Sequence, residues 1–222
     1  MKTILWDWNG TLLDDVQVSF DCLNDMLRLY QKPQVLSLDG YRAIFGFPVR
    51  DYYARAGFDG ALFDEVAPLW MADYMEKEIA CGLREGARAA LSAFRDAGRR
   101  QVILSASKRE NLLGQMARFD ILQYFDTVLG LDHIYATSKE GIGRAWMAEN
   151  AVPPADCVMI GDTLHDAEVA AAIGCRCVLV CGGHQLPQTL RTAGCAVAAD
   201  LKEAAEMALE MKIKAVMPDD PA

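Results

Sequence analysis

The chain from residue 82 onward alternates between short apolar runs and amphipathic stretches, and this alternation constrains the fold more than any other feature. The apolar runs predict strands over 101–105, 127–130, 157–161 and 176–181. The stretches around them predict helices over 86–97, 109–119, 141–149, 166–173 and 201–211. Parallel strands need long crossover connections, which are usually helical. The sequence therefore predicts an α/β fold with a doubly wound, mostly parallel sheet covered by helices on both faces.

The first third of the chain follows a different pattern. Lys2–Trp6 is an apolar run that predicts a buried strand, which ends at Asp7. Helical spacing then predicts helices over 16–30, 38–45, 49–56 and 61–80, where Pro68 either starts a new helix or kinks one. We expect a core made of residues 1–14 and 82–222, interrupted by an all-helical insert over 15–81.

Composition narrows the range of partners and locations. The 222 residues carry a formal net charge of −9, and nucleic acids are bound by clustered Lys and Arg, so we expect no nucleic-acid partner. No apolar run approaches the roughly 20 residues that a membrane span needs. The charge at Asp7 comes too early for a secretory signal. We therefore expect a cytosolic protein without a membrane partner, whose oligomeric state the sequence leaves open.

The seven cysteines are odd in number and include no CxxC pair, so they do not indicate a disulfide framework. Cys175, Cys177 and Cys181 could in principle gather a zinc ion together with His184. The alternative explanation is better, because Cys175 and Cys177 have the two-residue spacing of a strand and behave as small buried apolar side chains.

Polar residues collect where the predicted strands end, and ligands of a doubly wound sheet bind outside the carboxyl ends of its strands. The residues expected at this edge are Asp7, Asn9, Ser105, Ala106, Lys139, Asp162 and Asp166. The three carboxylates and the lysine leave two negative charges, which a divalent cation would neutralise. Mg²⁺ suits such a site, because it binds a few carboxylates and completes its shell with water and substrate phosphate.

Four motifs at these positions resemble those of the haloacid dehalogenase superfamily and occur in the same order. Ile4–Leu12 resembles the first motif, a strand followed by DxDGTL, and Ile103–Ser107 is similar to the second. Lys139 is similar to the third, without its usual proline, and Ile160–Asp166 resembles the fourth, GDxxxD. The helical insert lies where that superfamily carries a small cap. The resemblance therefore spans the whole chain and implies a Rossmann-like core with a helical cap, most similar to the phosphoglycolate phosphatase-like branch.

This resemblance implies a Mg²⁺-dependent phosphatase that hydrolyses a small phosphorylated metabolite. Asp7 would attack phosphorus and form an aspartyl-phosphate, which water then hydrolyses. The metal ligands would be Asp7, the backbone carbonyl of Asn9, and Asp162, with Asp166 a further ligand or a partner of the ligands.

The resemblance also assigns the groups that meet the substrate. The Ser105 hydroxyl and the Ala106 N–H would bind the phosphoryl oxygens, and Lys139 would neutralise both the phosphoryl group and the nucleophile. In the insert, Phe45–Arg50 resembles the loop that reaches the substrate, so Arg50 is the expected specificity contact.

Asn9 departs from the superfamily pattern, which has an acid at this position to protonate the leaving oxygen and activate water. An amide donates a hydrogen bond but exchanges no proton at neutral pH, and losing a general acid–base costs about 10²–10⁴-fold in rate. Three explanations stay open. In the first, the leaving group needs no protonation, as in an acyl phosphate, or water or a cap residue supplies the proton. In the second, the protein mainly binds a phosphometabolite and has little turnover. In the third, Asn9 is a substitution made to trap a complex.

Two other activities of the superfamily fit this chain less well. A phosphonatase would need a lysine in the cap loop, and residues 41–57 contain none. A hexose-phosphate mutase depends on an acid at position 9 to move protons. The expected activity is therefore phosphate-ester hydrolysis, with a low-turnover binding protein as the alternative.

Overall fold

The computed structural model describes residues 2–133, 135 and 138–211. A six-stranded sheet forms its centre, in the order β5-β4-β1-β6-β7-β8, and every neighbouring pair is parallel. The strands are β1 (Thr3–Trp6), β4 (Arg100–Lys108), β5 (Thr127–Leu131), β6 (Cys157–Gly161), β7 (Arg176–Val180) and β8 (Ala196–Ala198). Because β1 lies in the middle, the residues that follow it reach the centre of the sheet's carboxyl edge.

Alternate residues of the strands pack on opposite faces of the sheet, as the two-residue strand period requires. Ile4 and Trp6 belong to one apolar cluster, which includes residues of α5 (Ala87–Asp96), α6 (Arg109–Ala117) and α10 (Leu201–Glu210). Leu5 belongs to the other cluster, with residues of α7 (Glu140–Glu149), α8 (Leu164–Ile173) and α9 (Pro187–Leu190). The prediction of a mostly parallel sheet covered on both faces is confirmed.

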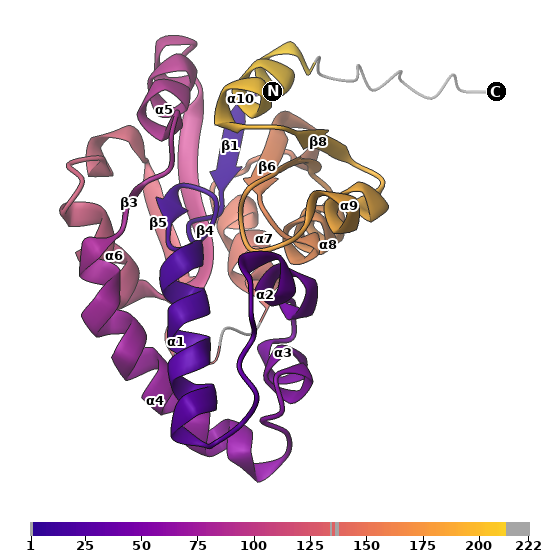
Figure 1. Cartoon of the computed structure of the whole chain (residues 1–222). Coiled ribbons are helices and arrows are strands. Elements are labelled where there is room, and N and C mark those ends of the chain that lie inside the picture. Colours follow the sequence, from indigo (N-terminus) through magenta and orange to yellow (C-terminus); the bar gives the residue numbers. More distant parts are fainter. Residues whose placement is uncertain (1, 134, 136–137, 212–222) are drawn as a thin grey trace.

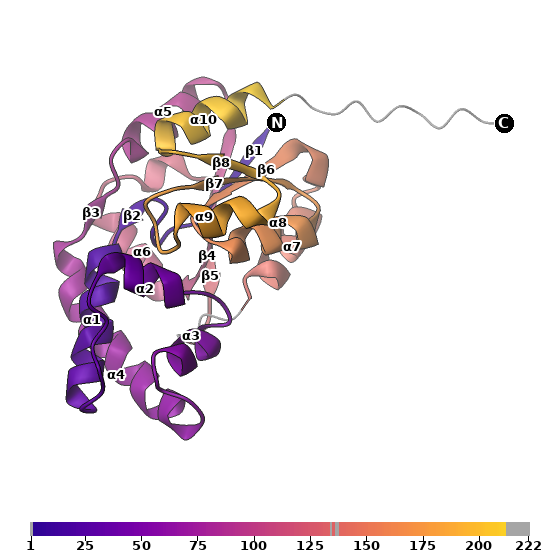
Figure 2. The ribbon, with the colours of Figure 1, turned by 45° about the vertical axis from the view of Figure 1, so that its right-hand side comes forward.

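The first four helices of the chain lie together at the carboxyl edge of the sheet, and we call them the cap helices (Figures 1 and 2). They are α1 (Val16–Leu29), α2 (Leu38–Ile44), α3 (Val49–Arg55) and α4 (Ala61–Lys77). They share an apolar cluster of their own, which includes Leu23, Tyr41, Phe58 and Val66. Pro68 lies inside α4, which runs on past it without a second start.

Two short strands join the cap helices to the sheet. β2 (Leu13–Asp14) pairs antiparallel with β3 (Gly82–Leu83), so both connections leave the core side by side. These strands, β8 and α9 have no counterpart among the sequence predictions, because elements of two to four residues are too short for a periodic pattern. The remaining elements are the 3₁₀ turns η1 (Glu78–Ala80), η2 (Leu122–Tyr124), η3 (Pro154–Asp156) and η4 (Arg191–Ala193).

The proposed boundaries of core and insert, 1–14 with 82–222 and 15–81, stay predictions, and residues 212–222 lie outside the described residues. All seven cysteines are unpaired. Cys177 is buried in β7, and Cys175 is half-buried just before that strand. Within the described part of the chain, none of the helices combines the length and the apolar character that crossing a bilayer requires.

Candidate active site

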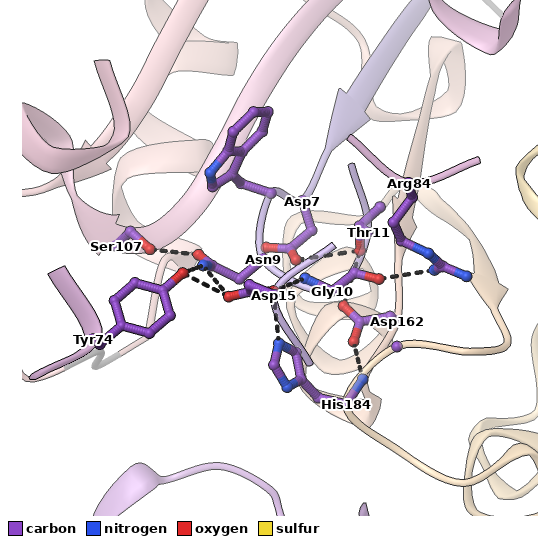
Figure 3. Close-up of polar contacts among 12 residues, drawn as sticks. Asp7, Asn9, Gly10, Thr11, Asp15, Tyr74, Arg84, Ser107, Asp162 and His184 are labelled. Atoms are coloured by element: carbon purple, nitrogen blue, oxygen red, sulfur yellow. Dashed lines mark hydrogen bonds and ion pairs between the residues drawn. The ribbon is translucent and has the colours of Figure 1, made fainter. Parts of the chain in front are cut away.

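The loop after β1 brings two aspartates of distant motifs together. Asp7 continues β1, and its backbone N–H donates to the Ile160 carbonyl of β6 at 2.9 Å. The Thr11 hydroxyl lies between the two acids, 2.9 Å from Asp162 Oδ1 and 3.3 Å from Asp7 Oδ2. All three side chains are buried. The predicted neighbourhood of the first and fourth motifs is therefore present in the geometry (Figure 3).

Gly10 makes this approach possible. Its φ is +69°, a conformation that favours glycine. A Cβ at this position would overlap the side chains of Asp162 and His184. Arg84 fixes the same loop, because its guanidinium donates to the carbonyls of Gly10 at 2.8 Å and Cys181 at 2.7 Å.

Lys139 is buried between two of the acids. Its Nζ contacts Asp7 Oδ1 and lies 2.7 Å from Asp166 Oδ1. The other oxygen of Asp166 closes the start of α8 in a capping box, accepting from the Thr163 hydroxyl at 2.7 Å and the Thr163 N–H at 2.9 Å. Asp166 thus orients both the lysine and the helix that follows the fourth motif.

The protonation of these groups follows from burial and from their neighbours. Burial, with Asp166 and Asp162 nearby, raises the pKa of Asp7 to about 8 against the opposing effect of Lys139. Burial would also raise the pKa of Asp166, but the Lys139 ammonium holds it below its usual range. Burial would lower the pKa of Lys139, yet Asp166 and Asp7 raise it above its usual range. Lys139 and Asp166 are therefore an ion pair at neutral pH, and burial disfavours the charged form of Asp7.

The side chain of Asn9 is fixed by three hydrogen bonds (Figure 3). Its Nδ2 lies 2.7 Å from Asp15 Oδ2 and 2.9 Å from the Tyr74 hydroxyl, and its Oδ1 accepts from the Ser107 hydroxyl at 2.6 Å. Tyr74 also donates to Asp15 Oδ2, at 2.7 Å. The amide is thus the donor partner of a buried carboxylate.

Asp15 and His184 belong to the site, although the sequence analysis assigned them no role in it. His184 Nε2 lies 3.2 Å from Asp15 Oδ1, and its Nδ1 lies 2.8 Å from the Tyr41 hydroxyl. Its backbone N–H donates to Asp162 Oδ2 at 2.6 Å. Burial alone would raise the pKa of Asp15 and lower that of His184, because it disfavours both charged forms. The interaction between the two side chains outweighs burial, so the pKa of Asp15 is lowered and that of His184 is raised.

One signal in the sequence could have identified His184, because Gly182-Gly183-His184 follows the predicted strand 176–181 at its carboxyl end. Asp15 has no comparable signal. It precedes α1 like an ordinary capping residue, yet its side chain makes no cap with that helix.

The second motif contributes a polar turn beside Asp7. The register between β4 and β5 shifts between Leu104 and Lys108, and Ser105 and Ala106 lie at this irregularity. Both residues are buried and line a cavity together with Asp7, Lys139 and Asp162. The structure thus brings the predicted phosphate-binding groups to the same cavity as the predicted nucleophile.

Arg50 is placed elsewhere. Its guanidinium is about half exposed, pairs with Asp64 at 2.8 Å, and lies 4.2 Å above the ring of Phe63. It is not among the described residues that line the cavity. A specificity role for Arg50 stays a prediction without support from its position.

The acidic residues fit a divalent metal ion. Asp7, Asp162 and Asp166 are all buried and offer one carboxylate oxygen each, with these oxygens within 4.8 Å of one another. An all-oxygen set of this kind matches the preference of Mg²⁺. A ligand role for the Asn9 carbonyl stays a prediction.

The parallel sheet, the cap helices and the buried acidic cluster define an α/β protein with a capped acidic site, and comparison with known proteins identifies the family. Residues 4–180 match the family model of haloacid dehalogenase-like hydrolases. The chain belongs to this family.

Individual relatives agree with this assignment. A phosphoglycolate phosphatase of Nitrosospira multiformis is 27% identical over 184 residues, which cover 78% of this chain and 80% of the relative. A crystal structure described as a predicted phosphatase from Clostridium acetobutylicum superposes with a TM-score of 0.81 at 22% identity, covering 95% of this chain and 99% of the other. CbbY of Rhodobacter sphaeroides, solved with xylulose-1,5-bisphosphate, has a TM-score of 0.70 at 19% identity, covering 91% and 96%. These two structures are similar in fold.

Proposed function

We propose that the chain is a Mg²⁺-dependent phosphatase that hydrolyses a small phosphorylated metabolite through an aspartyl-phosphate on Asp7. The observation that carries this proposal is the placement of Asp7 at the centre of the sheet edge, beside Lys139, Asp162 and the Ser105–Ala106 turn. The relatives named as phosphatases support the same reaction. The cytosolic location stays a prediction.

Each residue of the proposed site has its own role in the first step, the attack on phosphorus. Asp7 supplies the attacking oxygen, and the Lys139 ammonium offsets the repulsion between this carboxylate and the incoming phosphoryl group. The Ser105 hydroxyl and the Ala106 N–H would bind phosphoryl oxygens. Asp7 and Asp162, with the Asn9 carbonyl and Asp166, would hold Mg²⁺, which when bound supplies positive charge that stabilises the phosphoryl oxygens and favours ionised Asp7.

The experiment measures release of phosphate from p-nitrophenyl phosphate and acetyl phosphate with excess Mg²⁺ and after chelation. We expect turnover that depends on Mg²⁺ and disappears in Asp7→Asn. In the unaltered protein, rapid acid quenching should recover phosphate bound to residue 7. Turnover that survives Asp7→Asn would exclude Asp7 as the nucleophile.

A second candidate is a phosphometabolite-binding protein with little turnover. Asn9 favours it, because both ends of its amide are already hydrogen-bonded and an amide gives up no proton to a leaving group at neutral pH. Tight binding of a phosphometabolite without hydrolysis of either test substrate would support this candidate over the phosphatase.

A further inference from the structure

The cap side of the cavity is lined by aromatic and other apolar side chains. Those that line it are Phe45, Phe47, Val49, Tyr52, Tyr53, Phe63, Ala67, Trp70, Met71, Tyr74 and Met75. Within the described chain, Asp15 and Ser19 are the polar residues of the cap-side lining that carry no ring, and Asp15 is already paired. The Tyr52 hydroxyl and the Trp70 Nε1 are buried without a hydrogen-bond partner among the described residues, so these two rings also carry polar atoms. The organic part of a substrate seated at Asp7 would therefore meet mainly rings and thioethers.

Some of these rings contact side chains of the core, and we call the aromatic and apolar cap-side lining the aromatic wall. Phe45 stacks on His184 with the ring centroids 4.7 Å apart, and Phe47 stacks on His165 at 4.4 Å. Trp70 stacks on Tyr74 at 5.0 Å, and the Tyr74 hydroxyl is bonded to Asn9. The aromatic wall thus reaches Asn9, the residue at the position of the usual acid, through Tyr74.

Cationic side chains are missing from this wall. Residues 15–81 contain Arg28, Lys32, Arg42, Arg50, Arg55 and Lys77, and none of these fully described residues lines the cavity. Two of the arginines are bonded to backbone carbonyls, Arg42 to that of Gly183 at 2.9 Å and Arg55 to that of Ile44 at 2.7 Å. On the core side, Lys108 borders the cavity with its Nζ 2.7 Å from Glu110. A substrate carboxylate, as in phosphoglycolate, would have no cation of the cap to pair with.

We propose that the chain hydrolyses a small aryl phosphate, whose ring lies against the aromatic wall and whose phosphorus is joined to it through a phenolic oxygen. This proposal rests on the proposed phosphatase function and names its substrate class. A ring offers the large flat apolar surface that such a wall binds best.

The same substrate class suits the chemistry at position 9. Asp7 attacks phosphorus, the bond from phosphorus to the phenolic oxygen breaks, and phenolate leaves with the electron pair. Water then cleaves the aspartyl-phosphate and gives dihydrogen phosphate, whose excess proton passes through solvent to the phenolate. A phenol has a pKa of about 10, whereas water, to which a simple alcohol is comparable, has one of about 15.7. A phenolate can therefore depart without a protein acid, which Asn9 cannot supply.

The test compares four substrates at saturating Mg²⁺, by phosphate release. Phenyl phosphate has a ring and a good leaving group, whereas benzyl phosphate has a ring but leaves as an alkoxide. Acetyl phosphate has a good leaving group and no ring, and 2-phosphoglycolate has neither a ring nor a good leaving group. We expect phenyl phosphate to have the highest kcat/KM. Benzyl phosphate should have a KM within a few-fold of that of phenyl phosphate, but a kcat lower by about 10²-fold or more. Acetyl phosphate should have a KM about tenfold higher than that of phenyl phosphate.

A charged substitution in the wall tests the same inference from the side of the protein. Met71→Lys places a cation in the cavity, and Leu69→Lys, on the same helix but outside the cavity lining and 42% exposed, is the matched control. We expect Met71→Lys to raise the KM of phenyl phosphate and lower that of 2-phosphoglycolate, each by about tenfold, while Leu69→Lys changes neither. Calorimetric binding of phenylphosphonate and phosphonoacetate provides the same comparison without turnover, and phenylphosphonate should bind more tightly.

The outcomes separate this inference from the function on which it depends. Hydrolysis of acetyl phosphate, with a KM for phenyl phosphate no lower than that for 2-phosphoglycolate, would overturn the aryl substrate and leave the phosphatase intact. Absence of hydrolysis of all four compounds would overturn the phosphatase itself. An unchanged preference in Met71→Lys would show that the aromatic wall does not contact the leaving group.

Discussion

Replacing Asn9 by Asp should destabilise the protein in a way that depends on pH. In the native structure, Asn9 Nδ2 donates to Asp15 Oδ2 at 2.7 Å, and Asp15 is buried and paired with His184. Asn9→Asp places a second carboxylate against the first. Two unit charges at that distance repel by about 6 kcal/mol at an effective dielectric constant of 20, so the new carboxyl group would take up a proton instead.

The cost of this proton uptake sets the magnitude. Holding a carboxyl group of ordinary pKa, about 3.9, protonated costs about 4 kcal/mol at pH 7 and about 1.5 kcal/mol at pH 5. The folded-state pKa is raised above the unfolded value, so the protein loses stability as pH rises toward the folded pKa. We expect Asn9→Asp to lower the free energy of unfolding by up to these amounts, measured by urea denaturation at both pH values.

A matched variant makes the measurement specific. Asn150→Asp, at an exposed helix end without a carboxylate partner, should cost about 1 kcal/mol or less at both pH values. A loss in Asn9→Asp that is the same at pH 5 and pH 7, or no larger than the loss in Asn150→Asp, would refute the reasoning.

The same substitution should change catalysis selectively. A protonated carboxyl group at position 9 can give its proton to a leaving oxygen, which is worth about 10²–10⁴-fold where the leaving group is an alkoxide. Asn9→Asp should therefore accelerate hydrolysis of benzyl phosphate much more than that of phenyl phosphate or acetyl phosphate. Equal effects on all three would show that protonation of the leaving group is not the missing step.

Further predictions concern the charges and the loop of the site. Lys139→Met leaves a buried carboxylate without its cation, so it should lower the free energy of unfolding by about 3–5 kcal/mol in metal-free urea denaturation. Lys202→Met, at an exposed position, should lower it by less than about 1 kcal/mol. Equal losses in the two variants would contradict the ion pair. Burial raises the pKa of Asp7, so Mg²⁺ binding should release more protons at pH 7 than at pH 9. Calorimetry in buffers of different ionisation enthalpy counts the protons, and equal release at both pH values would place the proton elsewhere. Gly10→Ala should destabilise the protein by at least about 2 kcal/mol more than Gly60→Ala. Both positions have a positive φ, but only a Cβ at position 10 overlaps neighbouring side chains. Circular dichroism during urea titration compares the two variants, and equal losses of stability would show that the overlap is relieved.

The core half of the site could be predicted because each of its motifs follows a predicted strand. Parallel strands end at one edge, so the residues after β1, β4 and β6 meet there whatever lies between them. Asp7, Ser105 and Asp162 were therefore expected together, and they line one cavity. Their roles in catalysis stay predictions.

The cap half could not be predicted in this way, because its contacts join elements far apart in the sequence. His184 pairs with Asp15 across 169 residues and with Tyr41 across 143. Arg50 shows the converse, since its position in the loop motif suggested a substrate contact and its side chain instead pairs with Asp64 on α4. Local pattern states which residues lie on a helix, but packing between helices decides which of them face the cavity.

Asn9 has a different meaning in the structure from the one that its motif suggests. The sequence alone shows an acid missing from position 9, but the structure has a carboxylate 2.7 Å from the amide, on Asp15. That carboxylate cannot replace the lost acid, because His184 and its hydrogen-bond donors hold its pKa low and keep it ionised. Position 9 therefore lies beside an acceptor and not beside a proton donor, and the aromatic wall includes Tyr74, which contacts the same amide. Both features favour a leaving group that is stable as an anion and flat in shape.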